Sequence, residues 1–251
     1  MLRKKISITH AKSKKILVLN LKGGVGKSTF TVNLASKLCM AQHCVEIIDS
    51  DKQSSSHSWA KEIKQIESQQ LNISFRSYSD IASSIKVDRN CDFTLIDSPA
   101  NFDDNHIKKY LMLADYVVVP IQPSPIDLHA TLPLIEKILK NLALIKKEVK
   151  VGFVINRCTE GNPQVEQVRS LLDHFRQYQT LGLMSDSYLY QEPFQKKTIL
   201  DVDLDTPLWR EVFNWLQIEL TDKKVTPLTI KSHSQTNNNV RYSNLLSFRN
   251  W

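Results

Sequence analysis

This sequence of 251 residues has little cysteine, no export signal and no long apolar run. No run approaches the roughly 20 apolar residues that span a membrane, and the basic N-terminus lacks the apolar segment of a signal peptide. The four cysteines show no CxxC spacing and are too few for a disulfide framework. These absences argue against a membrane-spanning or disulfide-stabilised protein and predict a cytoplasmic one.

Acidic residues are missing from both ends of the chain. Positions 1–22 hold seven Lys and Arg residues and positions 223–251 hold five, in both cases without an acid. The stretch between these two ends holds 21 basic and 26 acidic residues. The middle of the chain, which we call the body, is therefore acidic, and both ends are basic. We expect a basic N-terminal extension over 1–13, one domain over 14–221 and a basic, disordered tail over 222–251. Such ends contact polyanions or stay solvated, and the sequence leaves both possibilities open.

Glycine is scarce, yet three of the six glycines lie within four residues, at Gly23, Gly24 and Gly26. The apolar residues 15–20 before them predict a buried strand, and residues 28–40 after them predict a helix. A strand, a glycine loop and a helix in this order form a phosphate-binding loop, because the loop amides and the helix N-terminus attract anions. We call residues 21–29 the phosphate loop. In it, Lys27 would contact the β- and γ-phosphates and Ser28 would bind Mg²⁺.

The phosphate loop departs from the usual G-x-x-x-x-G-K-[ST] pattern, because Leu21 replaces the first glycine and a second lysine, Lys22, follows it. In this it resembles the deviant Walker A loop of the ParA/MinD ATPases. The resemblance implies ATP binding, with Lys22 reaching the nucleotide of a second subunit. The implied nucleotide-binding residues of the loop are Gly23, Gly24, Val25, Gly26, Lys27, Ser28 and Thr29.

Acidic residues end two further strand-like segments, in the order that the family shows. Asp49 and Asp51 follow one apolar run, and their i, i+2 spacing directs both side chains to the same side of a strand. Asp97 ends a second run and resembles the Walker B acid. We expect Asp51 to orient and deprotonate the attacking water. The expected Mg²⁺ residues are Ser28, Asp49, Asp51 and Asp97. Lys52 stands where the family usually has proline.

The rest of the chain predicts a doubly wound α/β domain, a mostly parallel sheet with helices on both faces. We expect a strand over 150–157, a helix over about 162–178, a strand near 181–189 and a last helix over about 207–220. Residues 114–128 also match a family segment, and the resemblance covers about residues 14–220. By resemblance, Asn156 and Arg157 lie near the adenine base. The aromatic residues of the last helix are expected in the core.

The resemblance also implies a function, that of a small partition ATPase for plasmid or chromosome DNA. Such a protein forms a homodimer with ATP, binds DNA nonspecifically in the bacterial nucleoid, and hydrolyses ATP slowly until a ParB-like centromere-binding partner stimulates it. The expected DNA-contacting residues are Lys196, Lys197, Lys223 and Lys224. Glu192 stands where relatives often carry a base.

Two alternatives of the same fold remain open. A MinD-like membrane-cycling ATPase needs a C-terminal amphipathic helix, and residues 240–251 give a poor helix pattern, so a membrane partner is not expected. A non-hydrolysing assembly factor would have lost catalytic residues. The presence of Lys22, Lys27, Asp49, Asp51 and Asp97 argues against that alternative.

Overall fold

The computed structural model describes residues 5–51, 53–66, 73–77, 85–100, 103–199 and 204–218. The predicted tail over 222–251 lies outside the described residues, and so do Lys52, Lys223 and Lys224. None of the described helices is long and apolar enough to cross a membrane.

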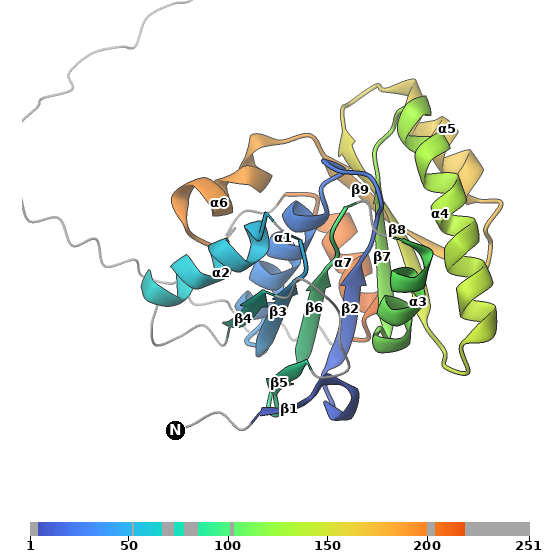
Figure 1. Cartoon of the computed structure of the whole chain (residues 1–251). Coiled ribbons are helices and arrows are strands. Elements are labelled where there is room, and N and C mark those ends of the chain that lie inside the picture. Colours follow the sequence, from blue (N-terminus) through green and yellow to red (C-terminus); the bar gives the residue numbers. More distant parts are fainter. Residues whose placement is uncertain are drawn as a thin grey trace, which may run out of the picture. The chain divides into compact units, whose positions relative to one another are not determined.

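A seven-stranded sheet forms the centre of the domain, and every neighbouring pair of its strands runs parallel (Figure 1). In sheet order the strands are β4 (Ile73–Ser77), β3 (Val45–Asp49), β6 (Phe93–Asp97), β2 (Lys14–Val18), β7 (Tyr116–Ile121), β8 (Lys150–Cys158) and β9 (Gln179–Ser185). Parallel neighbours need crossover connections, which the helices between the strands supply. The strands therefore all end on the same edge of the sheet.

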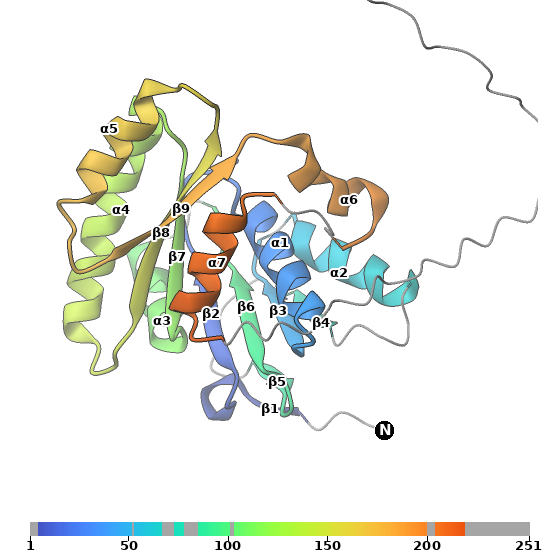
Figure 2. The same cartoon turned by 180° about the vertical axis from the view of Figure 1, so that it is seen from behind.

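Helices cover both faces of this sheet, as Figures 1 and 2 show from opposite sides. One face carries α1 (Lys27–Met40), α2 (Ser55–Ile66) and α7 (Thr206–Trp215), and the other carries α3 (Asp104–Leu113), α4 (Pro125–Leu144) and α5 (Pro163–Leu172). A short 3-10 turn, η2 (Tyr188–Gln191), and helix α6 (Glu192–Lys196) precede α7. The doubly wound fold predicted from the sequence is confirmed.

Each face of the sheet has its own hydrophobic core. Ile16 and Val18 of β2 pack into the core beneath α1 and α7, where the rings of Phe30 and Trp209 stack 5.6 Å apart. Leu17 points to the opposite face and joins the core beneath α3 and α4. This alternation is that of a strand buried on both sides. The aromatic face of the last helix is buried, as expected.

Part of the predicted N-terminal extension is folded onto the domain. Strand β1 (Lys5–Ser7) pairs antiparallel with β5 (Lys86–Asp88), and the 3-10 turn η1 (Ile8–His10) follows it. Ile8 is fully buried, and its N–H donates to the Ile85 carbonyl at 2.8 Å. Buried apolar side chains do not occur in solvated tails, so the N-terminal residues from 5 onwards belong to the folded domain.

Three predicted boundaries in the C-terminal part of the domain were wrong. The helix expected to reach about residue 178 ends at Leu172, and the strand expected to end near residue 189 ends at Ser185. Phe175 and Tyr178 leave the helix and contact the ring of Phe153. Tertiary packing of these aromatic residues therefore overrides the helical pattern. Helix α7 ends at Trp215 rather than continuing toward residue 220.

Candidate functional site

The phosphate loop connects β2 to α1 at the edge where the parallel strands end. Gly24 and Gly26 have φ values of 74° and 98°, in the left-handed region that favours glycine. Gly26 is the N-cap of α1, which has no side-chain cap and no acidic residue in its first turn. No residue of this first turn supplies a carboxylate that would compete for its N–H groups, and this helix end suits an anionic ligand.

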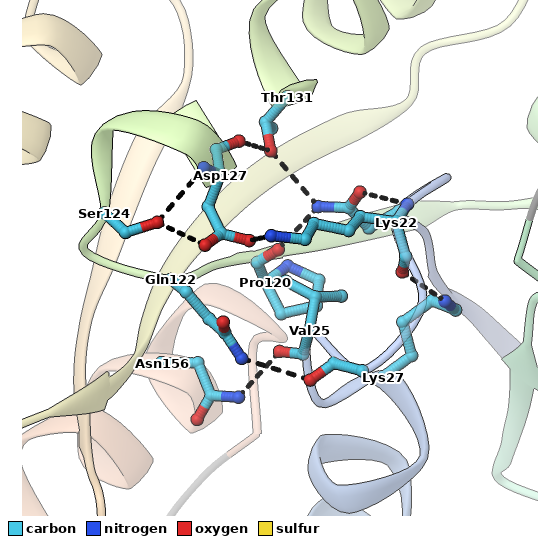
Figure 3. A network of polar contacts seen from close by, with 11 residues as sticks. Lys22, Val25, Lys27, Pro120, Gln122, Ser124, Asp127, Thr131 and Asn156 are labelled. Carbon is cyan, nitrogen blue, oxygen red and sulfur yellow. Dashed lines mark hydrogen bonds and ion pairs between the residues drawn. The ribbon is translucent and has the colours of Figure 1, made fainter. Parts of the chain in front are cut away.

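Two amide side chains hold the back of the phosphate loop (Figure 3). Asn156, at the end of β8, donates from Nδ2 to the Val25 carbonyl at 2.8 Å. Gln122, which follows β7, donates from Nε2 to the Gly24 carbonyl at 3.1 Å. The contact with Asn156 is so close that a Cβ atom on Gly26 would lie 2.0 Å from Nδ2. Only glycine fits at this position.

Lys27 is the first residue of α1, and its side chain turns back over the loop. The residue is only 6% exposed, and Nζ donates to the Lys22 carbonyl at 3.1 Å. Burial lowers the pKa of Lys27 from its ordinary value, while the carboxylates of Asp97 and Asp51 oppose that shift. The loop therefore holds a cation that little water can screen, close to two acids.

Lys22 makes an ion pair with Asp127, in the first turn of α4 (Figure 3). Asp127 also accepts a hydrogen bond from the hydroxyl of Ser124, the N-cap of α4. The Lys22 N–H donates to the Asn20 side chain at 2.9 Å, which fixes the start of the loop. The Lys22 side chain is about one third exposed, so the pair lies at the rim of the site.

Asp49 and Asp97 lie side by side, because they are register partners at the ends of β3 and β6. Both are fully buried. Asp49 accepts hydrogen bonds from the Ser56 hydroxyl at 2.8 Å, the His57 N–H at 3.0 Å and the Asp51 N–H at 2.9 Å. Its carboxylate thus anchors the start of α2. Its predicted role toward Mg²⁺ stays a prediction.

Asp97 differs from its neighbour, because neither carboxylate oxygen has a hydrogen-bond partner among the described residues. Burial raises the pKa of Asp97 to about 7, and the nearby Asp49 carboxylate adds to the shift. The hydroxyls of Ser28 and Ser56 and the Lys27 ammonium group counteract part of it. A buried carboxylate without a partner is costly unless a ligand satisfies it.

The residues around Asp97 fit a bound Mg²⁺ ion. The described part of the chain holds no group of three His, Cys, Asp or Glu side chains arranged for a metal. Mg²⁺ needs no such cage, because it takes one or two protein oxygens and completes its shell with phosphate oxygens and water. Asp97 and Ser28 would supply those protein oxygens, because Ser28 is near enough to lower the pKa of Asp97 while both carboxylate oxygens of Asp97 stay without a hydrogen-bond partner among the described residues.

Asp51 lies in the connection between β3 and α2, and it is half-buried. Its carboxylate accepts the Gln53 N–H at 3.0 Å, and its carbonyl accepts the Ser54 N–H at 3.0 Å. These bonds form a local turn with a positive φ at Ser54. Asp51 is close enough to Lys27 to act on its pKa. The structure therefore brings together the loop lysine and two of the predicted acids.

A model of the CobQ/CobB/MinD/ParA nucleotide binding domain matches residues 16–199. The chain belongs to this family. The resemblance found in the sequence is thereby confirmed, and so is the P-loop fold. The family description makes the chain a member of a nucleotide-binding ATPase fold. Nucleotide binding by the phosphate loop itself stays a prediction.

Similar proteins include one named for the maintenance of carboxysome distribution and one named as a plasmid partition protein. The chain is 27% identical over 159 residues to "Maintenance of carboxysome distribution protein A" of Halothiobacillus neapolitanus, covering 63% of this chain and 73% of that protein. Its fold is similar to McdA of Cyanothece in complex with ATP, with a TM-score of 0.64 and 17% identity over 84% of this chain and 99% of that chain. It is also similar to a putative plasmid partition protein of Borrelia burgdorferi bound to AMPPNP, with a TM-score of 0.63 and 20% identity over 82% and 99% of the two chains.

Asn156 and Arg157, the two residues expected near adenine, have different environments. Asn156 is buried against the phosphate loop, whereas Arg157 is exposed and has a φ of 55°. Contact of either residue with the base stays a prediction. The sequence alone predicted no role for Gln122, Ser124 or Asp127. The match of residues 114–128 to the family segment was the only signal that pointed to them.

The two lysines predicted to contact DNA, Lys196 and Lys197, lie at the end of α6 and are each paired with an acid. Lys196 contacts Glu192 at 2.8 Å, and Lys197 contacts Glu62 of α2 at 3.3 Å. Both lysine side chains are more than half exposed. They lie near each other on the surface, but their charges are locally balanced.

Proposed function

We propose that this chain is an ATPase that dimerises when it binds ATP and uses that cycle to distribute a cargo, with plasmid or chromosome DNA as the first candidate. The single observation that carries the proposal is the second lysine of the phosphate loop. Lys22 lies at the rim of the loop of a ParA/MinD-family fold, about one third exposed and paired with Asp127, whereas the Lys27 side chain is buried and turns back to the Lys22 carbonyl. Such a lysine is placed to act on another subunit.

The residues in and around the phosphate loop would have different roles in hydrolysis. Lys27 neutralises charge on the β- and γ-phosphates from a buried position, where an ammonium group is poorly screened. Ser28 and Asp97 would hold Mg²⁺, which would neutralise further phosphate charge. Asp51 orients the attacking water and accepts its proton, since phosphoryl transfer depends mainly on positioning and charge neutralisation.

Dimerisation and the ion pair of Lys22 are in competition. In the single chain Asp127 binds the Lys22 ammonium group, and Ser124 holds Asp127 in place. To reach the nucleotide of a second subunit, Lys22 must leave this carboxylate. The ATP-bound partner then supplies phosphate oxygens in exchange for Asp127, so that little charge pairing is lost.

If DNA is the cargo, the ATP-bound dimer binds DNA nonspecifically, and a ParB-like centromere-binding partner accelerates ATP hydrolysis and release from DNA. Contacts by Lys196, Lys197, Lys223 and Lys224 to phosphate groups would carry no sequence information. A second candidate cargo is a protein compartment. That reading is favoured by the relative named for maintenance of carboxysome distribution.

The test of dimerisation compares two lysine variants by light scattering with and without ATP and Mg²⁺. Lys27→Ala should abolish ATP binding, because the loop loses its buried cation. Lys22→Ala should still bind ATP but should not dimerise. Lys108→Ala, on the exposed side of α3, is the matched control and should behave as the wild type. ATP-dependent dimers of Lys22→Ala at the wild-type level would contradict the proposal.

The cargo is tested separately, by measuring the binding of wild-type protein to unrelated DNA duplexes. ATP-dependent binding of equal affinity for all duplexes, weakened by salt, supports the use of DNA as a track or cargo. Normal dimerisation with no DNA binding at low salt would contradict the DNA reading and leave the ATPase assignment intact. Binding to anionic vesicles in place of DNA would favour a membrane-cycling ATPase.

A further inference from the structure

Two carbonyl groups of consecutive residues in the phosphate loop are each bound by an amide side chain from another strand end. Gln122 donates to the Gly24 carbonyl at 3.1 Å and Asn156 donates to the Val25 carbonyl at 2.8 Å. The donors follow β7 and end β8, two neighbouring strands of the sheet. Figure 3 shows both side chains directed at the loop.

These two bonds determine where the loop N–H groups point. A peptide unit is planar and trans, so its C=O and N–H groups point in opposite directions. The Gly24 carbonyl shares a peptide unit with the Val25 N–H, and the Val25 carbonyl shares one with the Gly26 N–H. Holding both carbonyls toward Gln122 and Asn156 therefore turns these two N–H groups to the opposite side. N–H groups arranged in this way form the cradle that binds phosphate oxygens.

The Asn156 amide is itself held in place. Its oxygen accepts the Arg157 N–H at 2.9 Å, and the side chain is buried, with the residue 4% exposed. Its contact with Gly26 leaves no room for a Cβ atom there. The Asn156 amide is held through both its oxygen and its nitrogen, so it restricts the loop to one conformation before a ligand binds. Less conformational entropy is then lost when the ligand binds.

We infer that Gln122 and Asn156 are positioning residues which preset the phosphate loop for the polyphosphate of a nucleotide, whatever its base. The inference rests on the proposed binding of ATP by this loop. It gives Asn156 a role different from the adenine contact that the resemblance implies. A loop-positioning residue changes the affinity for any polyphosphate, whereas a base-reading residue changes the affinity for ATP alone.

The experiment compares Gln122→Ala, Asn156→Ala and the control Asn141→Ala, whose amide in the wild type donates to the Lys137 carbonyl at 2.8 Å within α4. Affinities are measured for ATP and for inorganic tripolyphosphate in competition with ATP, both with Mg²⁺. Each of the two loop variants should lose about fivefold for both ligands, the effect of one neutral hydrogen bond. The control should bind like the wild type.

A second measurement needs no nucleotide. Hydrogen–deuterium exchange of the loop amides should be faster in Gln122→Ala and Asn156→Ala than in wild-type protein or in Asn141→Ala. Unchanged exchange would overturn the inference, as would a loss of ATP affinity with tripolyphosphate affinity intact. If the wild type binds no ATP, the proposed function fails, and exchange still decides whether the two amides hold the loop. Gln122 is half-buried, so Gln122→Ala leaves no cavity in the hydrophobic core and should fold like the wild type.

Discussion

Lys27 and Asp97 are buried groups of opposite charge. Burial shifts the pKa of each in the direction that favours its neutral form. The pKa of Lys27 is lowered and that of Asp97 is raised to about 7. Their mutual attraction opposes both shifts but does not cancel them, because each group has lost its water. Keeping both groups charged in the folded protein therefore costs free energy of desolvation. A bound polyphosphate and metal ion would supply the opposite charges that both groups lack.

The pH dependence of stability should reveal Asp97. Because its folded pKa lies above its ordinary value of 3.8, the folded state holds the proton more tightly. Stability from this group is therefore present at low pH and is lost as pH rises through about 7. Between pH 5 and pH 8 the loss should be about 3 kcal/mol. Asp97→Asn removes the titrating carboxyl group and with it this loss of stability. The variant should therefore be more stable than wild type mainly at pH 8.

The measurement is the free energy of unfolding by denaturant, without nucleotide, for both proteins at both pH values. Comparing wild type with Asp97→Asn cancels the contribution of all other titrating groups. A difference between the two proteins that does not change with pH would show that Asp97 titrates in its ordinary range.

Asp51 is expected to act on the attacking water and not on nucleotide binding. Asp51→Ala should therefore bind ATP and form dimers that persist, because the charges that bind phosphate remain while the proton acceptor is gone. ATP turnover should fall at least tenfold, within the range typical of general-base removal. Turnover and light scattering in parallel check this, with Asp173→Ala on the surface as the control. Turnover at the native rate would transfer the role of base to another group.

The residues of the site differ in how far the sequence predicts them. The phosphate loop is predictable because its glycines and lysines are consecutive and lie between a strand and a helix. Asp49 was recognised as an acid at a strand end, but its hydrogen bonds to α2 depend on where that helix begins. Gln122 and Asp127 reach the loop from residues about a hundred positions away. No local pattern specifies such contacts.

At the scale of elements, central strands were easier to predict than the peripheral ones. The strands β2, β3, β6 and β7 are mostly apolar and almost entirely buried. Strands β1 and β5 have three residues each, and their pairing joins residues about 80 positions apart. Helix α5 ends early because Phe175 packs against Phe153. In both cases tertiary contacts, absent from local sequence, decide the outcome.

The buried N-terminal turn should stabilise the whole domain. Ile8 is fully buried in the core beneath α3 and α4, so Ile8→Ala should lower the free energy of unfolding by about 2 to 4 kcal/mol. Ile6 is only half-buried, and Ile6→Ala should cost clearly less. Denaturant unfolding of both variants measures the difference. Equal, small losses would mean that residues 5–10 do not dock in solution.

At the scale of the whole molecule, the distribution of charge would determine where the proposed dimer contacts DNA. The body between the basic ends carries more acidic than basic side chains, so a duplex is repelled except where bases gather. Lys196 and Lys197 adjoin each other, but Glu192 and Glu62 bind them in the single chain. Exposed ion pairs contribute little to stability, so a phosphate group can displace the glutamates.

This competition gives a matched pair of experiments on ATP-dependent DNA binding. Lys196→Ala combined with Lys197→Ala should lower affinity and reduce the salt dependence by about two phosphate contacts per subunit. Glu192→Gln combined with Glu62→Gln removes the competing acids, so it should raise affinity and keep the full salt dependence. Dimerisation by light scattering controls for indirect effects in both. If neither double variant changes the salt dependence or the affinity, the DNA contacts lie elsewhere, and Lys223 and Lys224 become the residues to substitute next.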